Sequence, residues 1–518
     1  MRDDRTLLAL LTLVLFVAGS WGVWGVDVPP YQDIPDHLAT ITVLLHPSDY
    51  PEFVSNGLLK TNSIFIIFGY VLGPLVGVKS VAKAFALLTL FLTSATVPRF
   101  LYAFTDRKRM LLGCLFVAPM VHNWWLSMGM VNFALAWPIA LWILIHQKRQ
   151  LEAPSVLRGF GIAVLALVLW LTHSIALLLV GLLVLIEATS APSWPARIKR
   201  LSLLAAPLAV AAPLIALAVF RHATQVGSPQ SGTVAATLYD TTLSAVYDLW
   251  AHFTYGLTER SAASIAPAVI LGGIAIKRWR EPLPFFGPRA FLALAMIYFI
   301  LPYDMPGFGY ACQRALPFLW TAALLRVPAD LPKAFQLIAF AGSFLWSIGM
   351  GVDLRNASRE QHVFWSGIEA VPKYAKLLTL NMAPRLYTRN TWSLRHASGL
   401  YTVEKLTTAQ DVWADSPSMP LFRVRAPEPI QDSVKLRHFL NAAVTSSSWC
   451  HALADRGAFT TTCTELWRGE WAELWKQAEP RFTHVVLWGA SDEVIALVPS
   501  RYQLTFENAA LRVYARAQ

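Results

Sequence analysis

Charged residues are scarce in this chain of 518 residues, which argues against a soluble protein. Only 14% of its residues are charged and 55% are hydrophobic, whereas soluble domains carry about 25% charged residues. The 20 tryptophans and 28 phenylalanines match the aromatic belts that membrane proteins place at the membrane–water interface. The composition therefore indicates a helical protein that crosses the membrane many times.

Cysteine is also rare, and its spacing disfavours a zinc or redox site. None of the four cysteines lies in a C-x-x-C pair, the spacing that such sites commonly use. Cys450 and Cys463 both fall in the polar C-terminal tail. They would form a disulfide if the tail lies in an oxidising compartment, but two ordinary thiols fit the sequence equally well.

No nucleic-acid-binding motif, internal repeat or low-complexity segment is evident. The net charge of +11 comes largely from basic residues in short loops between hydrophobic segments, which is typical of the cytoplasmic loops of membrane proteins. A nucleic-acid partner is therefore not expected. The first hydrophobic segment, residues 6–26, has no clear A-x-A cleavage site, which favours a membrane helix over a cleaved signal peptide.

The hydrophobic segments predict an all-α polytopic membrane domain over residues 1–352, with about 11–12 segments. The expected segments are residues 6–26, 63–78, 84–104, 111–121, 131–146, 159–188, 201–220, 264–276, 290–302, 316–327 and 333–352. Residues 159–188 are too long for one helix, because about 20 residues span a bilayer. We therefore divide them into two short helices near Thr172 and His173.

The polar tail, residues 353–518, is predicted to be a small extracytoplasmic α/β domain. FTHVVLWG and YQLTFENAALRVYA are rich in the β-branched and aromatic residues of strands, and SDEVIALV between them begins with Ser491, a good helix cap. The positions of the basic loops place this tail outside, together with two long loops at residues 27–62 and 221–263. Residues 63–78 are either a full span or a re-entrant piece, which leaves the number of crossings open.

The first long loop carries three ionisable residues within five positions, in the stretch YQDIPDHLAT. They are Asp33, Asp36 and His37. A carboxylate beside the membrane serves either as a general base toward an acceptor hydroxyl or as a ligand for a divalent metal, and His37 would assist either role. The structural alternative is that Asp36 caps a helix starting at His37, with Asp33 merely solvated.

Three motifs resemble those of the GT-C superfamily of membrane glycosyltransferases. They are DIPDH at residues 33–37 in the first loop, GMVNF at residues 129–133 at a hairpin tip, and QRALPF at residues 313–318 at the start of a late helix. The resemblance implies a sugar donor carried on a polyprenyl phosphate and an extracytoplasmic C-terminal domain. It also implies that the loop acid is the catalytic base, a role that maps best onto Asp33 and second onto Asp36.

Arg314 is the expected phosphate-binding residue, because similar enzymes use a basic residue near this position and a guanidinium binds phosphate bidentately. The alternative is an arginine whose charged end extends to the membrane interface. Further candidates for substrate binding are Gln313, Tyr303, Asp304, His122, Asn123, Asn132 and His173. For the histidines and asparagines, hydrogen bonds between helices are the alternative. No metal is assigned to any residue, and a divalent cation, Mg²⁺ or Mn²⁺, is the one candidate cofactor.

The function indicated is sugar transfer from a polyprenyl-phosphate donor to a lipid, glycan or protein acceptor at the outer face of a bacterial cytoplasmic membrane. In the tail, Arg395, His396 and several tryptophans fit a structural or acceptor-binding role. A transporter or flippase is the rival, although the chain lacks the repeats and paired broken helices typical of transporters. A non-catalytic subunit of a polysaccharide assembly system is the third alternative, in which Asp33 would be dispensable.

Overall fold

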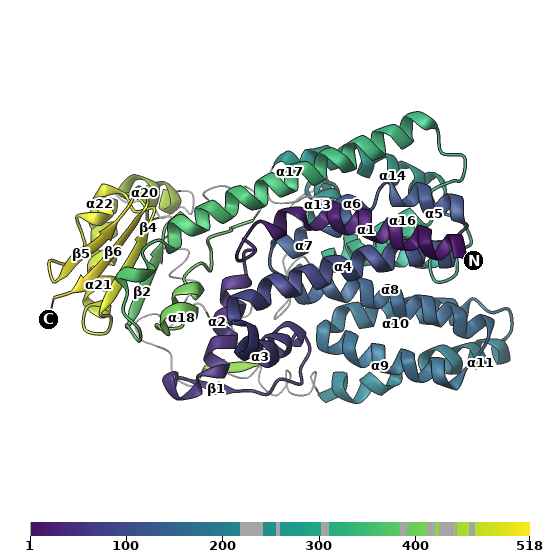
Figure 1. Ribbon diagram of the computed structural model, residues 1–518, viewed down its shortest axis with the longest axis horizontal. Helices are drawn as coiled ribbons and strands as arrows, with labels where there is room; N and C mark the ends of the chain where they lie inside the picture. Colours follow the sequence, from purple (N-terminus) through teal and green to yellow (C-terminus); the bar gives the residue numbers. More distant parts are fainter. Residues whose placement is uncertain are drawn as a thin grey trace.

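The computed structural model describes residues 2–217, 242–254, 259–301, 310–383, 391–410, 412, 420–423, 440, 443–454 and 462–517. A helical bundle makes up most of the molecule, and a sheet domain that contains the C-terminus lies at one end of it (Figure 1). The N-terminus lies at the opposite end of the bundle. One long helix runs along the bundle and leads into the sheet domain.

Several helices are long and apolar enough to cross a membrane, as the scarcity of charge predicts. Among the described residues four stretches qualify: Asp3–Trp24, Val78–Phe104, Arg260–Lys277 and Lys333–Ala370. They comprise most or all of α1 (Arg2–Trp24), α4 (Val78–Phe104), α14 (Ile265–Lys277) and α17 (Lys333–Trp365). Counting each of two bent helix pairs as one span raises the total in this part of the chain to six. The chain is a multi-pass membrane protein.

The other helices and strands of residues 34–324 pack around these four helices. In chain order they are α2 (Ile34–Leu45), η1 (Pro47–Asp49), β1 (Phe53–Ser55), α3 (Ile64–Val76), α5 (Arg107–Cys114), α6 (Ala118–Val121), α7 (Trp124–Ser127), α8 (Val131–Glu152), α9 (Val156–Thr172), α10 (Ser174–Thr189), α11 (Trp194–Ala205), η2 (Ala209–Ala211), α13 (Thr242–Thr254), η3 (Glu259–Ser264), α15 (Pro288–Ile300), η4 (Cys312–Ala315) and α16 (Leu316–Leu324). The predicted break near His173 is confirmed, because that residue separates α9 from α10.

The segment predicted at residues 111–121 is not a continuous helix. It is broken into α5, α6 and α7, and the chain bends by 71° between α5 and the piece formed by α6 and α7. Asn123 starts α7, because its side chain accepts a hydrogen bond from the Leu126 amide at 3.2 Å. This break creates a hairpin tip at residues 127–133 that stays inside the protein, since nearly all of its side chains are buried.

Residues 27–62, predicted as an external loop, are folded and in large part buried. They contain α2, which has 12 residues and is too short to cross a membrane. Apolar side chains of α2, among them Ala39 and Val43, pack against Tyr50, Phe53 and the C-terminal region. The strand β1 pairs antiparallel with β3 (Leu421–Arg423), which lies more than 360 residues later in the chain. The first loop and the tail therefore fold against each other.

The helix α17 connects the bundle to the tail. It has 33 residues and continues past residue 352, where the membrane domain was predicted to end, as far as Trp365. Where α17 crosses α1, Gly351 lies against the ring of Trp21 so closely that a Cβ at residue 351 would overlap it. The Trp21 Nε1 donates to the Ser347 carbonyl at 3.0 Å, and the Ser347 hydroxyl donates to the Ala18 carbonyl. These contacts hold α17 on the first membrane helix.

The tail contains a mixed four-stranded sheet with helices on both faces. Its strands β2 (Leu377–Asn381), β4 (His484–Trp488), β5 (Tyr502–Glu507) and β6 (Leu511–Arg516) lie in the order β2-β4-β6-β5, with β2 and β4 parallel. Its helices are η5 (Ile368–Ala370), α18 (Gly399–Lys405), α20 (Ser446–Ala454), α21 (Cys463–Ala478) and α22 (Asp492–Ile495). Val485 of β4 packs with the tryptophans of α21, and the next residue, Val486, packs with Phe364 at the end of α17.

The strands predicted in the tail are confirmed. FTHVVLWG contains β4, and YQLTFENAALRVYA forms the antiparallel pair β5 and β6. The predicted cap is also confirmed, because the Ser491 side chain accepts a hydrogen bond from the Val494 amide at the start of α22. Runs of β-branched and aromatic residues identified these strands, and such runs are typical of a strand in a sheet that is covered on both faces.

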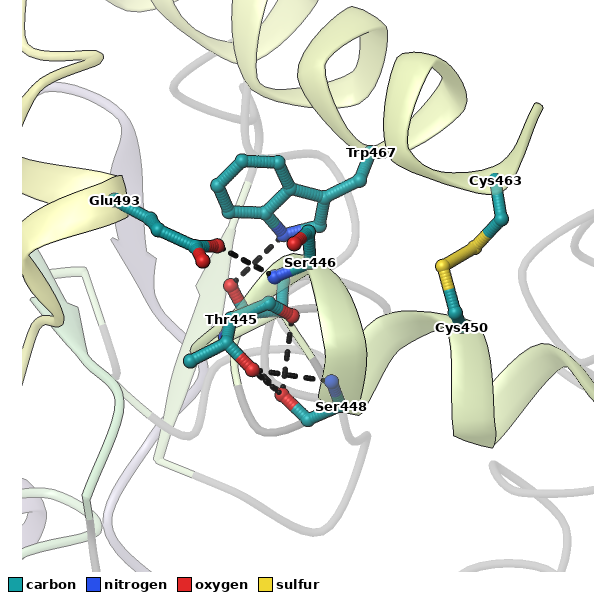
Figure 2. Close-up of a disulfide and its surroundings, with 8 residues drawn as sticks. Thr445, Ser446, Ser448, Cys450, Cys463, Trp467 and Glu493 are labelled. Atoms are coloured by element: carbon teal, nitrogen blue, oxygen red, sulfur yellow. Dashed lines mark hydrogen bonds between the residues drawn. A yellow bond between two sulfur atoms is a disulfide. The ribbon is translucent and has the colours of Figure 1, made fainter.

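Cys450 and Cys463 form a disulfide, which decides between the two alternatives left open by their spacing (Figure 2). Their Cα atoms are 5.7 Å apart, and the bond joins the middle of α20 to the first residue of α21. Beside it, the Trp467 Nε1 donates to the Ala443 carbonyl at 3.0 Å, and the Ser446 amide donates to the Glu493 carboxylate at 2.9 Å. The bond therefore links α20 to α21, which lies on one face of the sheet.

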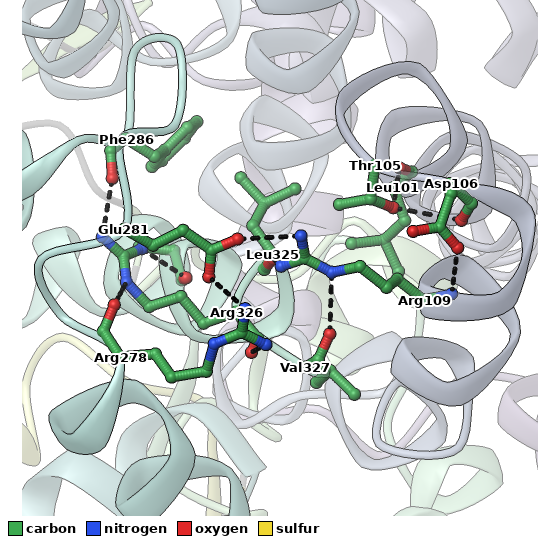
Figure 3. Close-up of polar contacts among 11 residues, drawn as sticks. Leu101, Thr105, Asp106, Arg109, Arg278, Glu281, Phe286, Leu325, Arg326 and Val327 are labelled. Carbon is green, nitrogen blue, oxygen red and sulfur yellow. Dashed lines mark hydrogen bonds and ion pairs between the residues drawn. The ribbon is translucent and has the colours of Figure 1, made fainter. Parts of the chain in front are cut away.

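A buried arginine holds together the end of the bundle farthest from the sheet domain (Figures 1 and 3). The guanidinium of Arg326, which is 0% exposed, donates to four backbone carbonyls. These carbonyls belong to Arg278, Trp279, Phe286 and Ala322. Nearby, Glu281 pairs with Arg109 at 2.8 Å and with Arg278 at 3.2 Å. Two basic loops that were predicted to share the cytoplasmic side, at residues 106–109 and 277–280, thus meet here.

Replacing Arg326 with methionine should destabilise the protein, because four buried carbonyls would lose their donor. Each polar group left unsatisfied costs about 1–3 kcal/mol. We expect the Tm of the detergent-purified protein to fall by several degrees. Arg289→Met, at an exposed residue of α15, is the matched control and should leave the Tm unchanged. Equal Tm values for the two variants would contradict the role given to Arg326.

Candidate functional site

Asp33 occupies the N-cap position of α2 and is buried against the hairpin tip. It is only 4% exposed. Its amide donates to the Met128 carbonyl, and the Gln32 amide donates to the Ser127 carbonyl, each at 3.2 Å. Gly129 has a φ of +81°, and a Cβ there would come within 2.6 Å of the Asp33 nitrogen. Only glycine therefore allows the acidic loop to lie this close to the hairpin.

Two nitrogen-bearing side chains converge on one oxygen of the Asp33 carboxylate. The Gln32 Nε2 donates to Oδ1 at 3.2 Å. The His396 Nε2 lies 3.6 Å from the same Oδ1, with the two side chains only 2% and 6% exposed. The expectation of a solvated Asp33 is therefore wrong, and the carboxylate is held inside the protein by polar neighbours.

The helix that follows begins at Ile34, three residues before the start expected under the capping alternative. Asp36 consequently lies in the first turn of α2 and does not cap the helix, and its side chain is fully buried. Gly399 of α18 packs on this turn so closely that a Cβ would overlap the Pro35 carbonyl. Asp33 and Asp36 both lie at the positive end of the α2 dipole, which favours ionised carboxylates.

His37 connects α2 to the hairpin rather than to Asp33 or Asp36. Its ring hydrogen-bonds the Gly129 backbone, and it meets the Phe65 ring edge-on with a centroid distance of 5.5 Å. Burial lowers the pKa of His37 to about 4, against the opposing effect of that hydrogen bond. The imidazole is therefore neutral at pH 7, and its position makes it an anchor for the tip.

Arg314 also contacts this hairpin. Its guanidinium carbon is 4.7 Å from the centre of the Phe133 ring and 5.2 Å from that of the Trp125 ring. Its Nη2 is 4.0 Å from the Met130 sulfur. The residue is only 8% exposed, unlike an arginine that extends to the membrane interface. Asp33 contacts residues 128 and 129 while Arg314 contacts residues 130 and 133, so both predicted residues lie against the hairpin tip.

His173 and Gln313 join this arrangement from neighbouring helices. The His173 ring meets the Phe133 ring edge-on at a centroid distance of 5.0 Å, so Phe133 contacts both His173 and Arg314. Gln313 is buried, and its Nε2 donates to the Asp248 carboxylate of α13 at 3.3 Å. Tyr303 and Asp304, the other two residues predicted near Arg314, lie outside the described residues.

The remaining predicted residues hold the hairpin in place. The Asn132 Oδ1 accepts from the Phe65 amide and its Nδ2 donates to the Asn62 carbonyl, each at 2.9 Å. The Asn123 side chain caps α7 and also donates to the Met120 carbonyl at 3.1 Å. His122 is fully buried, with its Nδ1 3.1 Å from the Gly19 carbonyl. Both asparagine side chains form hydrogen bonds with backbone groups. This favours a structural role for them over substrate binding.

Gln32, Trp392 and His396 also belong to the site, and of these only His396 was named from the sequence, for a structural or acceptor-binding role. His396 approaches Asp33 directly, whereas Gln32 connects Trp392 to Asp33. The Gln32 Oε1 accepts from the Trp392 amide at 2.8 Å, a contact between residues 360 positions apart. Gln32 is next to Asp33 in YQDIPDH, so its position in the sequence could have indicated a role at the site. No local pattern shows which tail residues fold onto the first loop.

A divalent cation was the candidate cofactor, and the residues around Asp33 do not form a site suited to it. The described part of the chain contains no group of three or more His, Cys, Asp and Glu side chains arranged to hold a metal. The neighbours of Asp33 Oδ1 are an amide nitrogen and an imidazole nitrogen, whereas Mg²⁺ and Mn²⁺ prefer oxygen ligands. Among the described residues, the surroundings of Asp33 therefore suit a carboxylate that acts as a base better than one that binds a metal.

No protein-family model and no curated protein sequence matches this chain. Among solved structures, the chain is similar to ArnT from Cupriavidus metallidurans. The crystal structure of ArnT bound to undecaprenyl phosphate matches over 99% of this chain and 98% of its own, with a TM-score of 0.50 and 13% identity. ArnT in the apo state matches over 97% of each chain, with a TM-score of 0.49 and 13% identity. The GT-C resemblance is thus confirmed for the fold, and the chain is a multi-pass membrane protein with an ArnT-like fold.

Proposed function

We propose that this protein is a membrane glycosyltransferase that moves a sugar from a polyprenyl-phosphate donor to a lipid, glycan or protein acceptor. The observation that carries the proposal is that Asp33 and Arg314 both contact one buried hairpin tip. A base and a phosphate-binding cation are the two groups that this reaction needs. ArnT, whose fold the chain shares, was crystallised with undecaprenyl phosphate, which supports a lipid phosphate as the ligand.

In the proposed reaction, Asp33 takes the proton of an acceptor hydroxyl. The acceptor oxygen then forms a bond to the anomeric carbon of the sugar, on the face opposite the phosphate. The bond between that carbon and the phosphate oxygen breaks, and the electron pair leaves with the polyprenyl phosphate. Configuration at the anomeric carbon inverts. Because phosphate is a good leaving group, holding the two substrates in line supplies much of the rate.

Arg314 would bind the phosphate of the donor and of the departing polyprenyl phosphate. A planar guanidinium donates two parallel hydrogen bonds to phosphate oxygens, which an ammonium does not do. The rings of Phe133 and Trp125 fix the plane of this guanidinium. They also exclude water, so that its attraction for a phosphate is stronger than at an exposed surface.

We place the site at the outer face of a bacterial cytoplasmic membrane. The disulfide between Cys450 and Cys463 supports this side, since disulfides persist in oxidising compartments. The tail that carries the disulfide packs on α2, so Asp33 lies at the same end of the bundle as the tail (Figure 1). The basic loops that meet at Arg326 lie at the other end, as expected for the cytoplasmic side.

Asp33→Asn should abolish sugar transfer, because the amide cannot accept the acceptor's proton. We expect a loss of about 10²–10⁴-fold, the usual contribution of a general base, and a smaller loss for Asp36→Asn. The assay follows transfer from radiolabelled undecaprenyl-phosphate pentoses and hexoses to acceptors in membranes. Asp49→Asn, an exposed acid of the same loop, is the control. If both Asp33→Asn and Asp36→Asn still transfer sugar, or if the wild type transfers sugar from no donor, a transporter or a non-catalytic subunit would be favoured.

Arg314→Met should weaken the binding of undecaprenyl phosphate. A hydrogen bond to a charged group contributes about 1.5–3 kcal/mol, which corresponds to about tenfold or more in Kd. Arg314→Lys should bind with intermediate affinity, since it keeps the charge but not the paired donors. Native mass spectrometry of the purified protein with undecaprenyl phosphate measures this, with Arg289→Met as the control. An Arg314→Met variant that binds as tightly as the wild type would remove Arg314 from the site.

Thiol labelling in denatured membranes tests the side on which the tail lies. If the tail is in an oxidising compartment, a maleimide should label only Cys114 and Cys312 before reduction and all four cysteines after it. Cys450→Ser should expose one additional thiol before reduction, because Cys463 loses its partner. Labelling of all four wild-type cysteines before reduction would place the tail in a reducing compartment.

A further inference from the structure

Residues 391–402 of the tail fold directly onto the loop that carries Asp33. The Trp392 amide donates to Gln32, His396 approaches the Asp33 carboxylate, and Gly399 packs on the first turn of α2. These contacts are successive along the segment, which lies beside α2 at the junction of the bundle and the tail (Figure 1). The proposed reaction gives this segment no task, although it closes one side of the acid's surroundings.

We propose that His396 is a positioning residue for Asp33, so that the C-terminal region completes the active site. The inference rests on the proposed function, because it assumes that Asp33 is the base. His396 acts through the carboxylate and is not proposed to touch the sugar or the acceptor. A chain without this region would keep Asp33 and Arg314 but would lose the group that orients the acid.

The geometry supports this role through the single oxygen that His396 and Gln32 share. Gln32 Nε2 donates to Asp33 Oδ1 at 3.2 Å, and His396 Nε2 lies 3.6 Å from it. Two groups that approach one oxygen restrict rotation of the carboxylate about its χ angles. The distance to His396 exceeds that of a hydrogen bond, and such contacts commonly shorten when substrate binds.

The burial of the pair explains why its loss should affect the rate. The His396 and Asp33 side chains are only 2% and 6% exposed. Water therefore cannot replace the imidazole as a neighbour of the carboxylate without a change in packing. In such surroundings the attraction between an N–H dipole and an anion is larger than in solution. Removing the imidazole would leave the carboxylate free to turn, and a shift of about 1 Å in a reacting group costs about 10²-fold.

The test compares His396→Phe with His396→Gln in the full-length protein, in the transfer assay with the undecaprenyl-phosphate sugar that the wild type uses. Phenylalanine fills the space without a donor, whereas the glutamine amide nitrogen reaches about as far as Nε2 of histidine. We expect His396→Phe to lower kcat by about tenfold to a hundredfold with an unchanged KM for the donor. We expect His396→Gln to recover most of that kcat. His484→Phe, in β4 of the same domain, is the matched control.

Several outcomes separate this inference from the proposed function. Wild-type kcat in His396→Phe, while Asp33→Asn is inactive, would overturn the inference and leave the function standing. The inference would also be overturned if His396→Phe raised the KM and left kcat unchanged. It would be overturned as well if His396→Gln, with a wild-type Tm, did not recover the kcat that His396→Phe loses. Full activity of Asp33→Asn would overturn the proposed function itself. If His396 acts through Asp33, the double variant Asp33→Asn with His396→Phe should be no slower than Asp33→Asn alone.

Discussion

The arrangement of the site depends on a hairpin tip that ends inside the protein. A helix that stops there leaves backbone groups in need of partners, and water is not available to supply them. Gln32 and Asp33 donate their amides to the Ser127 and Met128 carbonyls, and the His37 ring bonds the Gly129 backbone. Hydrogen bonds to the backbone groups of the tip therefore hold the acidic loop against it. Its carboxylate comes to lie beside the tip, which the guanidinium of Arg314 also contacts.

The helical framework and the sheet could be predicted from the sequence because their signals are local. Apolar runs located most membrane segments, the break at His173, and the strands β4, β5 and β6. The interruption of residues 107–127 was missed, since a run of apolar residues does not reveal a new short helix that begins after Asn123. The folded state of the first loop was also missed, because β1 pairs with β3 from the distant tail.

At the site, sequence reasoning identified ionisable residues but not their partners. Asp33 and Arg314 were found because they lie in DIPDH and QRALPF, two motifs that resemble those of the GT-C superfamily, and the hairpin that both contact carries the third motif, GMVNF. The role of Gln32 and the contact of His396 with Asp33 depend on chain segments 360 residues apart. Asn132 and Asn123 stood out as polar residues beside the hairpin tip, yet their side chains bond backbone groups. Residue type alone did not separate these two uses of a polar side chain.

The central claim is that Asp33 acts on the acceptor and Arg314 on the donor phosphate in one site beside the hairpin tip. A structure of the full-length protein with undecaprenyl phosphate bound tests it most directly. We expect the phosphate within hydrogen-bonding distance of the Arg314 guanidinium, with the oxygen that would carry the sugar directed toward Asp33. A phosphate bound at a distance from Arg314, with the hairpin and the acidic loop unchanged, would contradict the account.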